Sequence, residues 1–173
     1  MADRQPVETR NLDSYGDAVL PWTRPQAVLD AIDPKAHIAW FLGTAGANGR
    51  PHAAGVGALW YGGELYFTSG DGTKKSRDLG ANPSASISVS LPGMDLVFEG
   101  TVEKVTDAPT LEALVKAYNE SGWPASVEGD AFTAPYSAPS AGPPPWRLYR
   151  LVFDRVIGVA SAEPHGATLW RFA

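Results

Sequence analysis

The chain contains no cysteine, which excludes disulfide bonds, thiolate metal sites and cysteine nucleophiles. No apolar run approaches the roughly 20 residues of a membrane-spanning helix, and residues 1–7 are polar and charged, unlike a signal peptide. Acidic residues outnumber basic ones by 19 to 14, and this net charge of −5 disfavours nonspecific binding to nucleic acid. These absences predict a cytoplasmic protein that binds neither membranes nor nucleic acid.

Motifs for catalysis by side chains alone are also missing. The three histidines, His37, His52 and His165, are scattered without metal-ligand spacing, and no serine lies in a Gly-x-Ser-x-Gly elbow. The glycines of 43–49 lead into a strand pattern rather than the helix that a dinucleotide-binding turn requires. An enzyme with so few reactive groups needs a cofactor to supply the chemistry.

The order of the apolar patterns predicts one mainly β domain over residues 1–173. Asn-Gly and Gly-Gly turn signals separate the first three expected strands, so the sheet begins as antiparallel hairpins. A helix is expected to start at Thr23, acting as its cap, and another at Asp107. The expected strands cover residues 37–44, 51–61, 64–69, 84–90, 94–105, 146–160 and 168–172.

Two segments have a different character. Residues 1–20 are expected to form an extended arm. Residues 121–145 contain six prolines, several aromatic residues and no lysine or arginine. This composition is too aromatic for a plain linker, and it predicts either an ordered lid or a partner-binding loop.

The most informative stretch is 70–77, Gly-Asp-Gly-Thr-Lys-Lys-Ser-Arg, which follows an expected strand and leads into a helical pattern. It brings together two hydroxyl groups, several basic side chains and a helix N-terminus. These features together favour an anionic ligand, most plausibly a phosphate. The alternative is a solvated helix face. A P-loop is excluded because Thr73 stands where that motif requires glycine.

These motifs, together with 48–57, 65–68, Asn82-Pro83 and the terminal 167–172, resemble the pyridoxamine 5'-phosphate oxidase-like split-barrel superfamily. The resemblance covers roughly residues 20–120 and 146–172. It implies a six-stranded antiparallel split β-barrel with two to four short helices. It also implies a homodimer that binds FMN or the deazaflavin coenzyme F420 in a groove at the dimer interface.

The resemblance assigns the cofactor phosphate to the loop and helix after the third strand, and the cofactor ring to the second strand. The cofactor-binding residues implied are Ala54, Gly55, Val56, Gly57, Thr68, Thr73, Lys74, Lys75, Ser76 and Arg77. The small residues of the second strand agree, because a planar ring can lie against a strand only where side chains are small. The alternative is that these small residues pack against a helix or bend the barrel.

Some features depart from true pyridoxamine-phosphate oxidases. Ala54 and Leu59 stand where those enzymes have a phosphate-gripping Arg and Lys, and the C-terminal Arg-x-His substrate motif is missing. The chain is more similar to the flavin/deazaflavin oxidoreductase branch, in which F420 is frequent. The anionic oligoglutamate tail of F420 needs further basic groups, and the candidates are Arg50, Arg77, Arg147 and Arg150.

The sequence therefore predicts an oxidoreductase that transfers hydride between reduced F420 and a small organic substrate. A proton donor is expected in Tyr66, Tyr136 or an ordered water. The substrate pocket is assigned to Trp123, Phe132, Tyr136 and Trp146, which alternatively anchor the loop or pad the dimer interface. The alternatives in function are an FMN-dependent oxidase or reductase of the same fold, and a non-catalytic flavin- or haem-binding protein. No metal site is expected.

Overall fold

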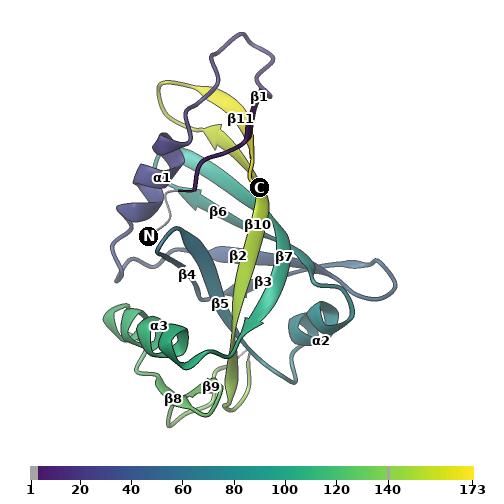
Figure 1. Ribbon diagram of the computed structural model, residues 1–173, viewed down its shortest axis with the longest axis vertical. Coiled ribbons are helices and arrows are strands. Elements are labelled where there is room, and N and C mark those ends of the chain that lie inside the picture. Colours follow the sequence, from purple (N-terminus) through teal and green to yellow (C-terminus); the bar gives the residue numbers. More distant parts are fainter. Residues whose placement is uncertain (1–3, 140) are drawn as a thin grey trace.

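The computed structural model describes residues 4–139 and 141–173, and within them the chain forms one antiparallel sheet with three helices (Figure 1). Residues 1–3 of the expected arm and residue 140 of the proline-rich segment lie outside the described residues. The helices are α1 (Thr23–Asp30), α2 (Lys74–Ala81) and α3 (Ala108–Glu120). The strands are β1 (Glu8–Asn11), β2 (Trp40–Ala45), β3 (Pro51–Val56), β4 (Ala58–Tyr61), β5 (Glu64–Gly70), β6 (Ser84–Leu91), β7 (Met94–Val105), β8 (Ser126–Glu128), β9 (Ala131–Thr133), β10 (Trp146–Ala160) and β11 (Gly166–Arg171).

Strand β10 organises the sheet and runs through most of the length of the molecule (Figure 1). It pairs with β7 along nearly its whole course, with β5 along its first half and with β11 along its second half. The register with β7 shifts between Phe153 and Arg155. Such a bulge bends the strand, so its two halves can pair with different partners.

The sheet is not closed by hydrogen bonds. Strand β3 pairs with β2 and strand β4 pairs with β5, although only Gly57 separates β3 from β4 in the chain. The two ends of the sheet are thus joined by the chain at Gly57. The sequence predicted a single strand over residues 51–61, and the break at Gly57 is a correction to that prediction.

The mainly antiparallel β architecture with a few short helices is confirmed, but the described residues contain eleven strands, whereas the family resemblance implied six and the apolar pattern predicted seven. Relative to the seven, part of the difference lies at Gly57. The rest lies in segments expected to lack strands: the arm contributes β1, which pairs with β11, and the proline-rich segment contains the β8–β9 hairpin.

Turn and cap residues explain several element boundaries. Gly62 and Gly63 both have positive φ angles (63° and 84°), as the tight turn between β4 and β5 requires. Asp107 caps α3 through a hydrogen bond from the Thr110 amide, as predicted. The prediction for α1 was wrong in detail, because its N-cap is Trp22 and no side chain caps it.

Two hydrophobic clusters fill the molecule. The larger one lies between the sheet strands and α1, and alternation in β6 supplies Ile87 and Val89 to it, as expected. The smaller one packs α3 against β5 and β10 and includes Phe132 of the β8–β9 hairpin. The hairpin, which joins the sheet through β9 and β10, therefore packs with α3 at the lower end of the molecule in Figure 1. None of the helices in residues 4–139 and 141–173 is long and apolar enough to cross a bilayer.

Candidate functional site

A cavity of about 600 Å³ lies where α3, the strand break at Gly57 and the first residues of β10 meet. Its walls also include the connection from α1 to β2 and one residue of α2. A volume of this size is typical of small-molecule and cofactor sites. The cavity is therefore the candidate functional site of the described chain.

The cavity brings together residues that lie far apart in the sequence. From the expected cofactor-binding set it is lined by Gly55, Val56, Gly57, Thr68 and Lys75. Five other members of that set do not line it: Ala54, Thr73, Lys74, Ser76 and Arg77.

Lys75 is the member of the basic stretch that reaches the cavity. Only 6 % of its surface is exposed, and this burial lowers the pKa of its ammonium group. Within the part of the chain that the structure describes, the Lys75 amino group forms no hydrogen bond or ion pair. A buried ammonium without a partner is costly, and an anionic ligand in the cavity would compensate it.

Lys74 has a different role, although it is adjacent in the sequence. Its Nζ donates to Asp78 Oδ2 at 2.6 Å, one turn along α2. The hydrogen bond from Lys74 is the main cause of the lowered pKa of the Asp78 carboxyl group, which also accepts from Thr44 Oγ1. Lys74 is therefore paired within α2, and Asp78 joins that helix to β2.

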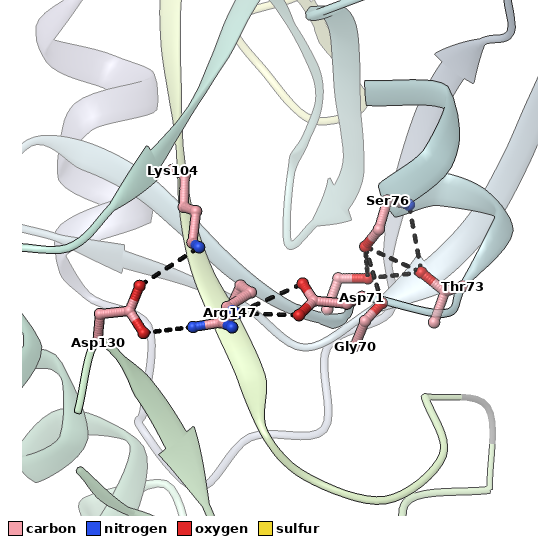
Figure 2. Close-up of polar contacts among 8 residues, drawn as sticks. Gly70, Asp71, Thr73, Ser76, Lys104, Asp130 and Arg147 are labelled. Atoms are coloured by element: carbon pink, nitrogen blue, oxygen red, sulfur yellow. Dashed lines mark hydrogen bonds and ion pairs between the residues drawn. The ribbon is translucent and has the colours of Figure 1, made fainter. Parts of the chain in front are cut away.

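The hydroxyl groups of the same stretch bond to one another. Thr73 caps α2 by accepting from the Ser76 amide, and the Ser76 hydroxyl lies 2.8 Å from Ser69 Oγ and 2.9 Å from the Gly70 carbonyl oxygen (Figure 2). Arg77 donates to the Gly72 carbonyl oxygen. These bonds shape the turn from β5 into α2 and so fix the direction in which Lys75 leaves the helix.

The aromatic residues expected in a substrate pocket divide into two pairs. Trp123 and Trp146 line the cavity, with their ring centroids 5.5 Å apart. Phe132 is fully buried in the smaller core cluster, and Tyr136, 43 % of whose surface is exposed, has its ring centroid 6.0 Å from that of Trp146. The first pair can contact a ligand, and the second pair supports the first.

Several lining residues were not predicted from the sequence. Tyr118 of α3 lines the cavity and donates to the Gly57 carbonyl oxygen, although its helical spacing indicated only a core residue. Trp60 also lines it, and its indole nitrogen donates to Asp30 at 2.7 Å. The α1–β2 connection, including His37, forms one wall, and no sequence pattern pointed to it.

Neither tyrosine expected as a proton donor lines the cavity. The Tyr66 hydroxyl donates to Glu64 at 2.5 Å, and burial together with this bond raises the pKa of Tyr66. Among the described residues, no group of three or more histidine and acidic side chains is arranged to hold a metal ion.

A sequence model of the pyridoxamine 5'-phosphate oxidase family matches residues 26–159 of the chain, a range that contains every residue lining the cavity. A comparison with curated protein sequences found no match.

Solved structures with a similar fold include two with TM-scores of 0.59. One is a pyridoxamine 5'-phosphate oxidase-related, FMN-binding protein from Nostoc punctiforme, at 18% identity over 89% of this chain and 92% of that one. The other is a haem-binding protein from Mycobacterium smegmatis, at 19% identity over 87% of this chain and 59% of that one. An F420 reductase is 23% identical over 73% of this chain and 90% of its own, with a TM-score of 0.49, too low to support a structural conclusion.

Proposed function

The chain belongs to the pyridoxamine 5'-phosphate oxidase family, and on that premise we propose that it is an oxidoreductase that binds a phosphorylated flavin-type cofactor. In the form we favour, the cofactor is F420, and hydride passes between reduced F420 and a small organic substrate. The observation that carries the proposal is the convergence of Lys75, Thr68 and the glycine-rich strand break on one cavity.

The two glycines at the break fit a planar ring. A Cβ atom built on Gly55 or on Gly57 would meet no atom within 4 Å, and neither residue has a positive φ angle. Neither local packing nor backbone conformation therefore requires glycine at these positions. The open space beside both glycines, which line the cavity, would admit a ligand ring lying against the strand.

Lys75 fits the phosphate of such a cofactor. Its buried ammonium would form a charge-assisted hydrogen bond with a phosphate oxygen, and Thr68 would donate from β5. Trp123 and Trp146 would exclude water from the bound ring. The cofactor supplies the hydride chemistry when bound, and the residues of the chain bind, orient and desolvate it.

One observation favours FMN as the alternative cofactor. Most of the arginines expected to meet the anionic tail of F420 are already engaged. Arg147 pairs with two aspartates, Arg150 with two glutamates, and Arg77 with a carbonyl oxygen. Arg50 forms no such ion pair among the described residues and is exposed. FMN lacks the tail and needs no such arginines.

Haem binding without turnover is a second candidate function, because His37 lines the cavity and an imidazole there can serve as an axial ligand. His165 pairs with Glu163 instead, and His52 does not line the cavity. Replacement of His37 by alanine would abolish a Soret band if haem were the ligand.

We also propose that the protein is a cytoplasmic homodimer, with a partner covering the outer face of β2 and β3. Phe41 of β2 is 51 % exposed and lies opposite Gly55 of β3 in the strand register. A large aromatic side chain flanked by a glycine on an open sheet face suits burial by a second copy.

The test is a paired fluorescence titration of the purified protein with F420 and with FMN. Tight binding of F420 with little binding of FMN supports the hydride-transfer proposal, and the next step is a screen of substrates with reduced F420. Preferential binding of FMN would identify FMN, and not F420, as the cofactor. If neither binds at micromolar concentration, the cofactor proposal is wrong, and a haem titration follows.

A further inference from the structure

Arg147 lies at the start of β10 and bridges two loops that are distant in the sequence. Its Nε lies 3.1 Å from Asp71 Oδ2, in the turn that precedes α2. Another guanidinium nitrogen donates to Asp130, in the turn of the β8–β9 hairpin, and Lys104 also pairs with Asp130 at 3.4 Å. Figure 2 shows Arg147 between the two aspartates.

Neither loop lines the cavity, but each is joined to or packed against a residue that does. The turn at Asp71 leads into α2, which carries Lys75. The hairpin that contains Asp130 is packed behind the aromatic wall, since Phe132 lies 6.0 Å from Trp123 between ring centroids.

Arg147 itself does not line the cavity, whereas its neighbour Trp146 does. Successive side chains of a strand point to opposite faces, so Trp146 faces the cavity and Arg147 faces the two loops. The backbone of Trp146 is in register with Gly70 of β5 and with Phe132 of β9. The start of β10 therefore pairs both with the strand that leads into the α2 turn and with the β8–β9 hairpin.

We propose that Arg147 is a positioning residue that couples the turn leading into α2, and through it Lys75, to the aromatic wall of the cavity, so that cofactor affinity depends on a side chain outside the binding site. This proposal rests on the proposed function. The guanidinium pairs with both loops at once, so displacement of one loop weakens the ion pair of Arg147 with the other. Without it, Asp71 and Asp130 would face each other with Lys104 as the counter-charge, and the loops would tend to separate.

The experiment compares Arg147→Met with a matched control, Arg155→Met. Arg155 lies on the same strand and pairs with Glu99 at 3.2 Å, but it does not line the cavity or contact either loop. Arg147→Met removes two ion pairs and Arg155→Met removes one, so a loss of arginine ion pairing by itself would affect both variants. We expect the affinity for whichever cofactor binds the wild type to fall about tenfold in Arg147→Met and to stay within about twofold in Arg155→Met.

Two one-sided variants separate coupling from simple loss of charge. Asp71→Asn releases the α2 turn alone, and Asp130→Asn releases the hairpin alone. Coupling predicts that each weakens cofactor binding, and that in hydrogen–deuterium exchange each accelerates exchange in the loop that was not mutated. Faster exchange confined to the mutated loop in both variants would overturn the proposal, as would unchanged cofactor affinity in Arg147→Met.

The exchange measurement also keeps the two proposals apart. It is made on the protein without ligand, so it tests the coupling even if neither F420 nor FMN binds. Absence of binding to the wild type counts against the proposed function alone. Coupled exchange in the one-sided variants would still support the role of Arg147.

Discussion

The Tyr118 hydroxyl donates a hydrogen bond of 3.0 Å to the carbonyl oxygen of Gly57. This bond joins helix α3 to the break between β3, which pairs with β2, and β4, which pairs with β5. Strand breaks interrupt the ladder, and the buried Tyr118 supplies a hydrogen bond to the carbonyl group at this one. A residue of α3 thus holds the cavity wall at the strand break.

Replacement of Tyr118 by phenylalanine keeps the ring and removes the hydrogen bond. We expect the free energy of unfolding to fall by about 1 kcal/mol, because the Gly57 carbonyl loses its partner. Cofactor binding should also weaken severalfold as the strand break moves. Urea unfolding and cofactor titration measure the two effects. Tyr15→Phe is the control, because Tyr15 is 94 % exposed, and equal behaviour of the two variants would contradict the prediction.

Lys75→Met should separate binding from stability. A lost charge-assisted contact is worth about 1–3 kcal/mol, so cofactor affinity should fall by roughly tenfold or more. Stability at neutral pH should be unchanged or higher, because the folded protein no longer buries an unpaired cation. Titration calorimetry and urea unfolding check both. Unchanged cofactor affinity in Lys75→Met would show that Lys75 does not bind the cofactor.

The pH dependence of this variant has a defined sign. Burial lowers the pKa of Lys75 below 10.5 in the folded state, so between the two values the folded protein binds fewer protons than the unfolded protein. The contribution of Lys75 to the free energy of unfolding of the wild type therefore rises with pH between its folded-state pKa and 10.5. The stability advantage of Lys75→Met should shrink as the pH approaches 10.5.

Lys74→Met should act on folding instead. Its pair with Asp78 lowers the pKa of that carboxyl group below 3.8, so the pair stabilises the fold above this value and is lost as the pH falls through the folded-state pKa. We expect Lys74→Met to be less stable than wild type at neutral pH, with a difference that narrows in acid. Chemical unfolding at neutral pH and at a pH below 3.8 measures the difference in stability. A difference that does not change with pH would contradict the prediction.

Gly57→Val should fill the cavity without disturbing its walls. The site for a Cβ has no atom within 4 Å, so the free energy of unfolding should change by no more than about 1 kcal/mol. Cofactor affinity should fall at least about tenfold, because the side chain occupies the space of the ring. Gly80→Ala, also at an open position but in α2, serves as the control and should bind like wild type.

Phe41→Glu tests the proposed homodimer. A charge at this half-exposed position should prevent a second copy from covering the sheet face, so sedimentation equilibrium should show a dimer for wild type and a monomer for the variant. Val7→Glu, at a position 69 % exposed on the N-terminal arm, is the control. A wild-type monomer, or a variant that remains dimeric, would contradict this interface.

The sequence by itself determined the antiparallel β architecture, the position of most strands and the cap of α3. These features depend on local properties: alternation of apolar residues, turn glycines and capping side chains act within a few residues of one another. The bounds of β7 and β10 follow directly from their apolar patterns. The glycines of the second strand and the Lys74-Lys75 pair could be singled out for the same reason, because residue type and spacing alone distinguish them.

Only the tertiary structure decided which members of the basic stretch reach the cavity. Lys74 and Lys75 are equivalent in sequence, but they leave the helix about 100° apart, and one meets Asp78 while the other meets the cavity. Tyr118, Trp60 and the α1–β2 connection border the same space because the sheet brings distant segments together. The strand break at Gly57 has the same origin, since which neighbour a strand pairs with depends on the whole sheet and not on the strand's own residues.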